Sequence, residues 1–397
     1  MNPSLTNISS EDNNTLKFTL SGINVSLANA LRRTILSDIP IVAIYTQTYE
    51  DNHCNIEINT SRLHNEILKQ RLSCIPVHMK DLDVLPNNYL LEVDVTNNTE
   101  AMMYVTTEDF KIKNKENGNY LTKEEVNKIF PMNTKTNMYI DFMRLRPGIS
   151  EQIPGEQIKL TAEFSVHTAK EDGMFNVASK CSYGNTPDLV KANDVWQKKE
   201  DTMRSENATN DEINFEKKNF YLLDAQRSCV DDSFDFVIQT LGIYDNKELI
   251  LNACRVLEGK FNELIQNLDS DLVSILRSET TIDNCYDIVL ENEDYTIGKS
   301  LEYILYEHYY QSDKLTYCGF KKFHPHDDNS KIRLAGDSDF DAEEEFELIE
   351  DRKDFGLARS ASGMSWMSGG SGAGSISSGK MKRLWNENYS FCLIETE

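Results

Sequence analysis

The residues that most suggest chemistry lie near the carboxyl end, where GSISSGKM (374–381) comes close to a phosphate-binding loop. Such a loop has Gly, four residues, Gly and Lys, and then a Ser or Thr whose hydroxyl group reaches Mg²⁺. Gly374, Gly379 and Lys380 keep this spacing, but Met381 occupies the hydroxyl position and no apolar strand precedes the loop. We therefore expect a flexible Ser/Gly-rich linker. A nucleotide-binding protein that uses Gly374–Lys380 is kept as an alternative.

Two other sets of residues have side chains of the types that can bind metal ions. Aspartates alternate at Asp337, Asp339 and Asp341 within an acidic run, a pattern typical of solvated surface. Cys54, Cys74 and His78 are irregularly spaced, and none of the eight cysteines forms a C-x-x-C pair. We expect reduced thiols in an intracellular chain, with neither a metal ion nor another cofactor.

Arg32 and Arg33 stand side by side in VSLANALRRTIL, within a chain of formal net charge −24. Adjacent basic residues on a helix usually form a solvated face. A related stretch, YTIGKSLEYIL (295–305), follows at an offset of 270 residues, but carries Glu302 and Tyr303 at the arginine positions. Guanidinium groups suit carboxylates and backbone carbonyls at an interface. The loss of both arginines from the second stretch favours a binding role for them in the first.

Composition limits the class of protein. The 397 residues include 65 acidic and 41 basic side chains, so the surface as a whole repels phosphate backbones. Contact with DNA is therefore expected only indirectly, through other proteins. No apolar run reaches the length of a membrane span, and Met1-Asn2-Pro3 does not open a signal peptide. We expect a soluble protein in a reducing intracellular compartment.

Two helices are expected to position the arginines and their surroundings. The first covers 26–37, because Leu27, Leu31 and Ile35 recur at helical spacing, and this turns the two arginines away from the apolar face. The second covers 246–268, and its apolar stripe needs a large partner surface. Further helices are expected to begin at Thr60 or Ser61 and at Thr296.

Strands are expected between these helices, at runs rich in β-branched or alternating apolar residues. Their ranges are 16–22, 41–50, 89–97, 138–145, 157–167, 233–242, 285–294, 314–323 and 330–335. Residues 184–216 have few apolar side chains and many charges, so we expect a mobile loop with some helix there.

The order LANALRRTILSDIP, VAI and NTSRLHNEILKQRLSCIP resembles the signature of the α-type polypeptides of RNA polymerase, such as bacterial alpha, archaeal D and the third-largest polypeptide of polymerase II. The matching positions are Asn29, Ala30, Leu31, Arg32, Arg33, Asn59, Thr60, Ser61, Leu63, Glu66, Leu68, Arg71, Leu72, Ile75 and Pro76. The second stretch resembles the small partner, archaeal L or the eleventh polypeptide of polymerase II. Its matching positions are Glu293, Asp294, Thr296, Gly298, Leu301, Leu305, Gly319, Phe320, His324 and Pro325.

This resemblance implies an α+β fold with two tandem dimerisation domains, which form an intramolecular pseudo-dimer. A mostly β inserted domain interrupts the first of them. The implied ranges are 14–57 with 217–268 for the first domain, 58–216 for the inserted domain, 280–350 for the second domain and 357–397 for a flexible tail. The family's small partner ends in a long amphipathic helix, which residues 337–354 match only as an acidic segment.

The resemblance also implies a function: a non-catalytic assembly platform of a DNA-directed RNA polymerase, with the catalytic residues in other subunits. The implied partners are the largest and second-largest subunits and small polymerase subunits, rather than a second copy of this chain. The implied partner-binding residues are Asn29, Arg32, Arg33, Asn59, Glu66 and Arg71, with the arginines on the second-largest subunit. The residues expected to pair the two halves are Leu27, Leu31, Ile35, Ile250, Leu257, Phe261, Leu264, Ile297, Leu301 and Leu305.

Fusion of both partners in one chain resembles the arrangement in large cytoplasmic DNA viruses, whose polymerase is built outside the nucleus. It implies viral transcription in a factory in the host cytoplasm, with packaging in the virion as a further expectation. A third alternative is an interaction protein that keeps the fold and works without a polymerase.

Overall fold

A computed structural model describes residues 3–11, 14–150, 152–270 and 272–336. The expected Gly374–Lys380 loop, the alternating aspartates, the acidic segment 337–354 and the expected tail 357–397 all lie outside these residues. The described chain is a mixture of helices and antiparallel sheets.

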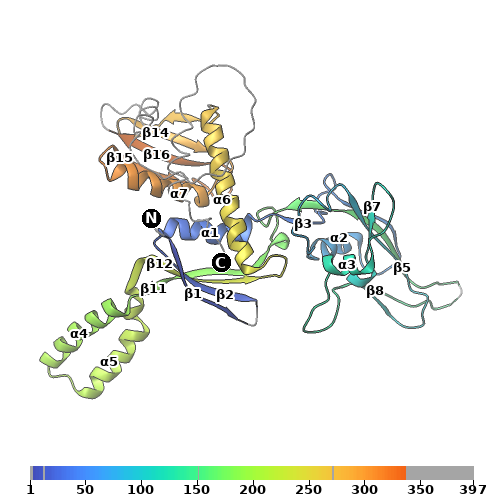
Figure 1. Cartoon of the computed structure of the whole chain (residues 1–397), viewed down its shortest axis with the longest axis horizontal. Coiled ribbons are helices and arrows are strands. Elements are labelled where there is room, and N and C mark those ends of the chain that lie inside the picture. Colours follow the sequence, from blue (N-terminus) through green and yellow to red (C-terminus); the bar gives the residue numbers. More distant parts are fainter. Residues whose placement is uncertain (1–2, 12–13, 151, 271, 337–397) are drawn as a thin grey trace, which may run out of the picture.

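The first sheet joins segments from the two ends of a long stretch of chain (Figure 1). Its strands run in the order β1 (Ser4–Glu11), β2 (Thr15–Ser21), β12 (Cys229–Thr240) and β11 (Ala178–Pro187). The apolar residues that alternate along β2 and β12 are buried, and Phe18 lies opposite Phe236 with the ring centroids 5.2 Å apart. Helix α1 (Val25–Ser37) covers this apolar face, so the period-two pattern of the strands and the helical pattern of α1 form one core.

A second sheet repeats the strand–helix order of the first. Its strands run in the order β13 (Ile275–Arg277), β14 (Cys285–Leu290), β16 (Ser330–Gly336) and β15 (Leu315–Lys321). Helix α7 (Tyr295–Leu305) follows β14, packs on the sheet and continues into a π-helical turn, Tyr306–Tyr310. We call β2 with α1 the first copy and β14 with α7 the second copy.

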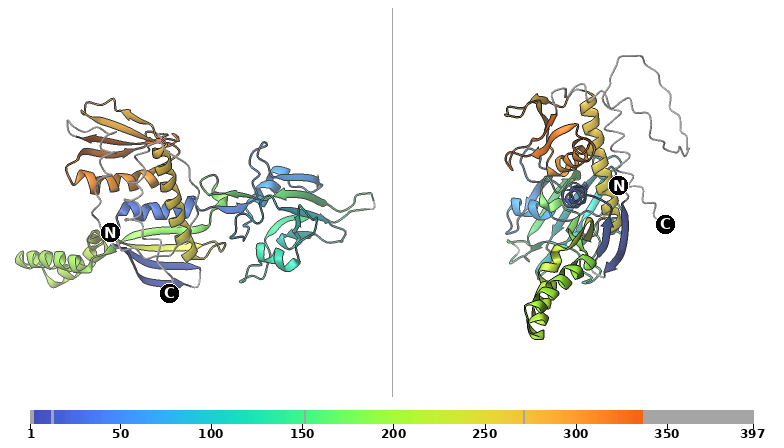
Figure 2. Two further views of the ribbon diagram at one scale, coloured as in Figure 1. Left: turned by 45° about the horizontal axis from the view of Figure 1, so that its top comes forward. Right: turned by 90° about the vertical axis from the view of Figure 1, so that its left-hand side faces the viewer.

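Helix α6 (Asn246–Asp269) connects the two sheets. Leu249 and Ala253 near its start are buried in the core of the first sheet, whereas Leu257 and Phe261 are buried in the core of the second. Figure 2 shows the helix running from one sheet to the other beside α1 and α7. The apolar stripe predicted over 246–268 is thus divided between two cores. Within the described ranges, no helix is long and apolar enough to span a membrane.

A largely β unit lies between α1 and β11 in the sequence. One sheet has the order β4 (Cys54–Asn59), β9 (Gln157–Glu163), β5 (Tyr89–Thr96) and β7 (Lys111–Asn114), and β6 (Met103–Thr106) pairs with β8 (Asp141–Leu145). Helices α2 (Asn65–Ser73) and α3 (Lys123–Ile129) pack on the same core. Short 3₁₀ turns are Thr107–Asp109, Gly173–Phe175 and Asp224–Arg227. The unit joins the rest through β3 (Ile41–Ala43) and β10 (Ser165–His167), which pair with each other.

Several predicted elements have different limits in the structure. The strand expected over 41–50 ends at Ala43, and that over 157–167 is divided between two sheets at Phe164. The helix expected from Thr60 or Ser61 begins at Asn65, because the Asn59 side chain accepts hydrogen bonds from Ser61 and donates one to the Leu63 carbonyl. These bonds hold a turn where the sequence suggested a helix.

Residues 184–216, expected to form a mobile loop with some helix, are largely helical. This stretch contains the end of β11, helix α4 (Leu189–Ser205) and most of α5 (Asn210–Leu222), which form a hairpin projecting from β11 and β12 (Figure 1). Asp188 caps α4, Thr209 and Glu212 form a capping box for α5, and Trp196 packs in a small core of its own.

The expected domain limits do not coincide with the ends of elements. The limit at 57/58 falls inside β4, and that at 216/217 falls inside α5. Strand β11, which the sequence assigned to the inserted domain, pairs with β12 of the first sheet. Main-chain pairing over so long a sequence separation leaves no signal in local residue patterns.

Candidate interface site: the contact between the two copies

Helices α1, α6 and α7 meet around Ala30, which is 2% exposed. Its small side chain allows α7 to approach closely, and Leu257, Phe261, Ile297 and Leu301 are buried in the same cluster. We call this cluster the three-helix contact. Each large apolar side chain buried in it contributes about 1.5–3 kcal/mol before the loss of conformational entropy is subtracted.

The residues predicted to pair the two halves separate into two groups. Leu257, Phe261, Ile297, Leu301 and Leu305 are buried in the core that contains the three-helix contact, and Leu264 packs against it. Leu31 and Ile35 are instead buried in the first sheet's core, with Leu27 and Ile250 packed against that core. The apolar face identified on α1 therefore covers its own sheet, and the smaller Ala30 faces the second copy.

Arg33 forms the most direct polar contact between the copies. Its Nε donates a hydrogen bond to Thr296 Oγ1 at 2.9 Å, and its Nη2 lies 2.5 Å from Asp294 Oδ2. Both charged side chains are about 30% exposed, at 31% and 29%. The sequence predicted that Arg33 would face a partner protein, whereas the structure brings it to the second copy of the same chain.

Asp294 also begins α7. Its side chain accepts a hydrogen bond from the backbone N–H of Thr296 at 2.8 Å, which is the N-cap interaction of a helix. Burial alone would raise the pKa of Asp294, but its hydrogen bonds with Thr296 and the Arg33 charge outweigh this and hold the pKa below its ordinary value. The carboxylate is therefore charged where the two copies meet.

Lys260 forms a second ionic contact on α6. Its Nζ lies 2.9 Å from Asp38, the C-cap residue of α1, and 3.5 Å from Glu293, which precedes α7. Burial favours a lower pKa for Lys260, but the two carboxylates together raise it. Lys170 adds a hydrogen bond from its Nζ to the carbonyl of Asn292 at 3.2 Å. Three cations of the first half thus contact residues 292–296.

Arg32 points to a different side of α1 from Arg33. Its Nε and Nη2 donate to Asn29 Oδ1 at 3.0 and 2.9 Å. Its positive charge opposes the upward pKa shifts that burial causes in Cys181 and Tyr183 of β11. The two neighbouring arginines therefore have separate environments, one near β11 and one against α7.

The remaining predicted partner-binding residues lie in the β unit around α2, away from the three-helix contact (Figure 1). Asn59 holds the turn before α2, and Glu66 is exposed in the first turn of that helix. Arg71 donates to the carbonyls of Phe142 and Asp141, each at 2.6 Å, and so fixes α2 to β8. The structure does not bring these three residues together with Arg32 and Arg33.

Sequence reasoning missed the roles of Lys260, Asp38, Glu293 and Asp294 at this contact. Glu293 and Asp294 were noticed only as marks of resemblance, although an Asp two residues before Thr296 is a recognisable helix-cap signal. The ion pairs between the two copies join positions more than 30 residues apart in the sequence, and no local pattern predicts such pairs.

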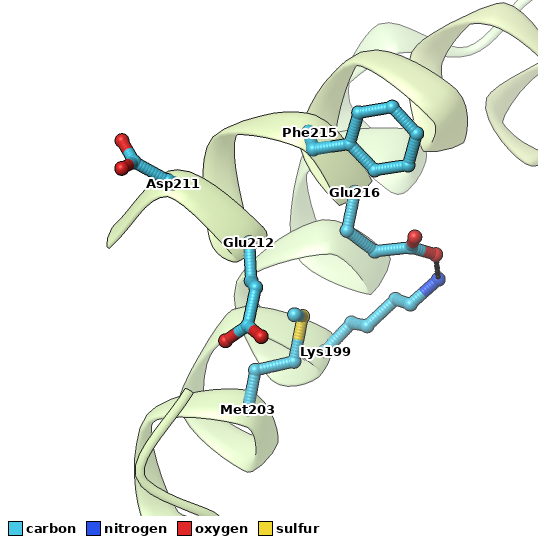
Figure 3. Close-up of a pocket in the computed structure, with 6 residues that line it drawn as sticks. All are labelled: Lys199, Met203, Asp211, Glu212, Phe215 and Glu216. Carbon is cyan, nitrogen blue, oxygen red and sulfur yellow. Dashed lines mark hydrogen bonds and ion pairs between the residues drawn. The ribbon is translucent and has the colours of Figure 1, made fainter. Parts of the chain in front are cut away.

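An open hollow of about 610 Å³ lies between α4 and α5 and is lined by Lys199, Met203, Asp211, Glu212, Phe215 and Glu216 (Figure 3). The lysine is ion-paired with Glu216, and Glu212 caps α5. Three carboxylates and one paired lysine would repel phosphate groups, so this hollow gives no support to nucleotide binding. Across the described residues, no group of three or more His, Cys, Asp or Glu could hold a metal ion.

Comparison with known proteins matches residues 17–261 to the family described as the RNA polymerase Rpb3/Rpb11 dimerisation domain. The human protein named DNA-directed RNA polymerases I and III subunit RPAC1 is 24% identical over 302 residues, covering 65% of this chain and 83% of the relative. Subunit Rpo3 of Methanosarcina acetivorans is 24% identical over 286 residues, covering 64% and 94%. RNA polymerase II subunit RPB3 of Schizosaccharomyces pombe is 23% identical over 267 residues, covering 65% and 85%. The family match ends within α6, before the second copy.

Proposed function

The chain belongs to the RNA polymerase Rpb3/Rpb11 dimerisation-domain family, and on this premise we propose that it is a non-catalytic assembly subunit of a multisubunit DNA-directed RNA polymerase. The names of its relatives, all subunits of such polymerases, support this role. In our proposal the chain supplies a rigid platform, and the residues that carry out RNA synthesis belong to the large subunits.

The observation that carries the proposal is the three-helix contact. Ala30 of the first copy and Leu301 of the second share one core with Phe261 of α6, within a single chain. We infer that the two copies act as tandem dimerisation domains and form an intramolecular pseudo-dimer, in which the β unit is an insertion into the first. An apolar stripe as long as that of α6 would be costly to leave in water, which supports pairing within the chain.

We further propose that the surfaces beside this contact bind the largest and second-largest subunits and small polymerase subunits. Arg32 with Asn29, near β11, is assigned to the second-largest subunit, and Asn59, Glu66 and Arg71 around α2 to the same assembly. Arg33 is not included, because its guanidinium group is used within the chain. The fusion of two copies supports a viral polymerase that works in the host cytoplasm and is packaged in the virion.

The test is purification of the tagged full chain from the cells that produce it, with the bound proteins identified by mass. We expect the two largest polymerase subunits in near-equal amounts with the tagged chain. Recovery of the intact protein without any polymerase subunit would contradict the proposal and favour an interaction protein that works alone. Binding of ATP that disappears in Lys380→Ala would instead favour the nucleotide-binding alternative.

A further inference from the structure

We propose that the Arg33–Asp294 ion pair makes pairing selective, so that a first copy joins a second copy and does not join another first copy. The inference rests on the pseudo-dimer of the proposed function and adds the residues that determine its partner choice. It concerns which copies pair, and it holds whatever polymerase subunits bind outside.

The two copies start their helices in the same way but with different charge. Asn24 Oδ1 accepts from the N–H of Ser26 at 2.8 Å, and Asp294 Oδ1 accepts from the N–H of Thr296 at 2.8 Å. These N-cap residues are equivalent, because the offset between the copies is 270 residues. Asn and Asp are about equally good N-caps, so the difference at this position is not needed to start a helix.

The position that corresponds to Arg33 in the second copy is Tyr303. In a two-fold arrangement, each contact between residues i and j recurs with the roles exchanged. The reciprocal of the Arg33–Asp294 pair therefore falls on Tyr303 and Asn24, which carry no charge. The charged pair therefore occurs on only one of the two sides related by the pseudo-two-fold axis.

Self-pairing of two first copies would lose this complementarity. Each Arg33 would meet Asn24 instead of a carboxylate, and the position of Glu293, which contacts Lys260, would be occupied by Ile23. On each side Arg33 would be left without a carboxylate and Lys260 would keep only Asp38. A partly buried charge that loses its partner is strongly unfavourable. Such a penalty against the wrong partner makes pairing specific for the right one.

The experiment uses the full chain with a protease site inserted after Ser270, an exposed residue that follows α6. Cleavage after folding removes the covalent link between the copies. In the uncut chain this link gives each copy a high effective concentration near the other, which would hide any preference. Two preparations carrying different tags on the amino-terminal piece are mixed, and each tag is used to capture pieces. For the natural sequence we expect each amino-terminal piece to retain a carboxyl-terminal piece and not to capture the other tag.

The decisive variant moves the carboxylate from one copy to the other, with Asn24→Asp and Asp294→Asn. Both helices keep a good N-cap, so folding is preserved. We expect capture of one tagged amino-terminal piece by the other to rise at least about tenfold, with release of the carboxyl-terminal piece. Unchanged capture in the variant would overturn the inference while leaving the pseudo-dimer intact. Separation of the natural pieces without self-pairing would instead contradict the pseudo-dimer itself.

Discussion

Arg33 and Asp294 are 261 positions apart in the sequence, yet the guanidinium group of one lies 2.5 Å from the carboxylate of the other. The arginine lies within α1 and the aspartate is the N-cap of α7, so this pair joins the body of the first helix to the start of the second. A residue that looked available for another protein thus stabilises the chain that contains it.

Arg33→Ala is therefore expected to destabilise the fold, by about 2 kcal/mol, because Asp294 would lose the cation beside it. Urea unfolding followed by circular dichroism gives the value. The control is Arg204→Ala, which removes an ion pair with Glu200 from the exposed hairpin and should change the free energy by no more than about 0.5 kcal/mol. Equal effects of the two changes would contradict the prediction.

Asp294→Asn should change how stability depends on acid pH. The pKa of Asp294 is lowered in the folded state from its ordinary value of 3.8, so the unfolded chain binds more protons as the pH falls. The contribution of this group is complete above its unfolded pKa and is lost as the pH falls through the folded value. The free energy of unfolding of the natural protein should therefore fall more steeply below about pH 5 than that of the variant. Parallel curves would show that the Asp294 carboxylate gains no stability from its hydrogen bonds with Thr296 and from Arg33.

Arg32→Ala should leave folding nearly unchanged and weaken capture of the second-largest polymerase subunit. Truncation of a desolvated arginine at an interface typically costs 2–5 kcal/mol, roughly a thirtyfold or greater loss of affinity. Pull-down with increasing amounts of that subunit measures the change. Glu302→Ala, at the corresponding position of the second copy, is the control and should retain full binding. Normal capture by Arg32→Ala would mean that this arginine is only a solvated group.

Replacement of the α4–α5 hairpin by a short turn should preserve the rest of the fold. The small core around Trp196 is separate from the three larger cores, and β11 and β12 pair up to Pro187 and Cys229 at the base of the hairpin. We expect the free energy of unfolding to change by less than about 1 kcal/mol, which corresponds to a shift of about 1 °C in the midpoint of thermal unfolding for a chain of this length. A larger fall would show that the hairpin supports the first sheet.

Local patterns predicted most elements of the two copies and few of the contacts between them. The alternation of β2 and β12 and the helical stripe of α6 depend on neighbouring residues, so the sequence reveals them. The hairpin was missed because its helices have only a small apolar core, and capping supplies much of the signal. The face of α1 that meets α7 was missed because its central residue is Ala30, whose small size gives no strong apolar signal.

The pairing of β2 with β12 also determines when the first sheet can form during synthesis of the chain. Phe18 is made early but pairs with Phe236, so the ribosome must add more than 200 residues before β2 meets β12. During this interval the β unit can complete its own core, since all the residues of that core lie between Val42 and Phe164. A product that ends before Cys229 would therefore contain a finished β unit beside an unfinished sheet that exposes Leu16, Phe18 and Leu20 to water. We expect such fragments to aggregate or be degraded, because the first sheet cannot fold until β12 has been synthesised.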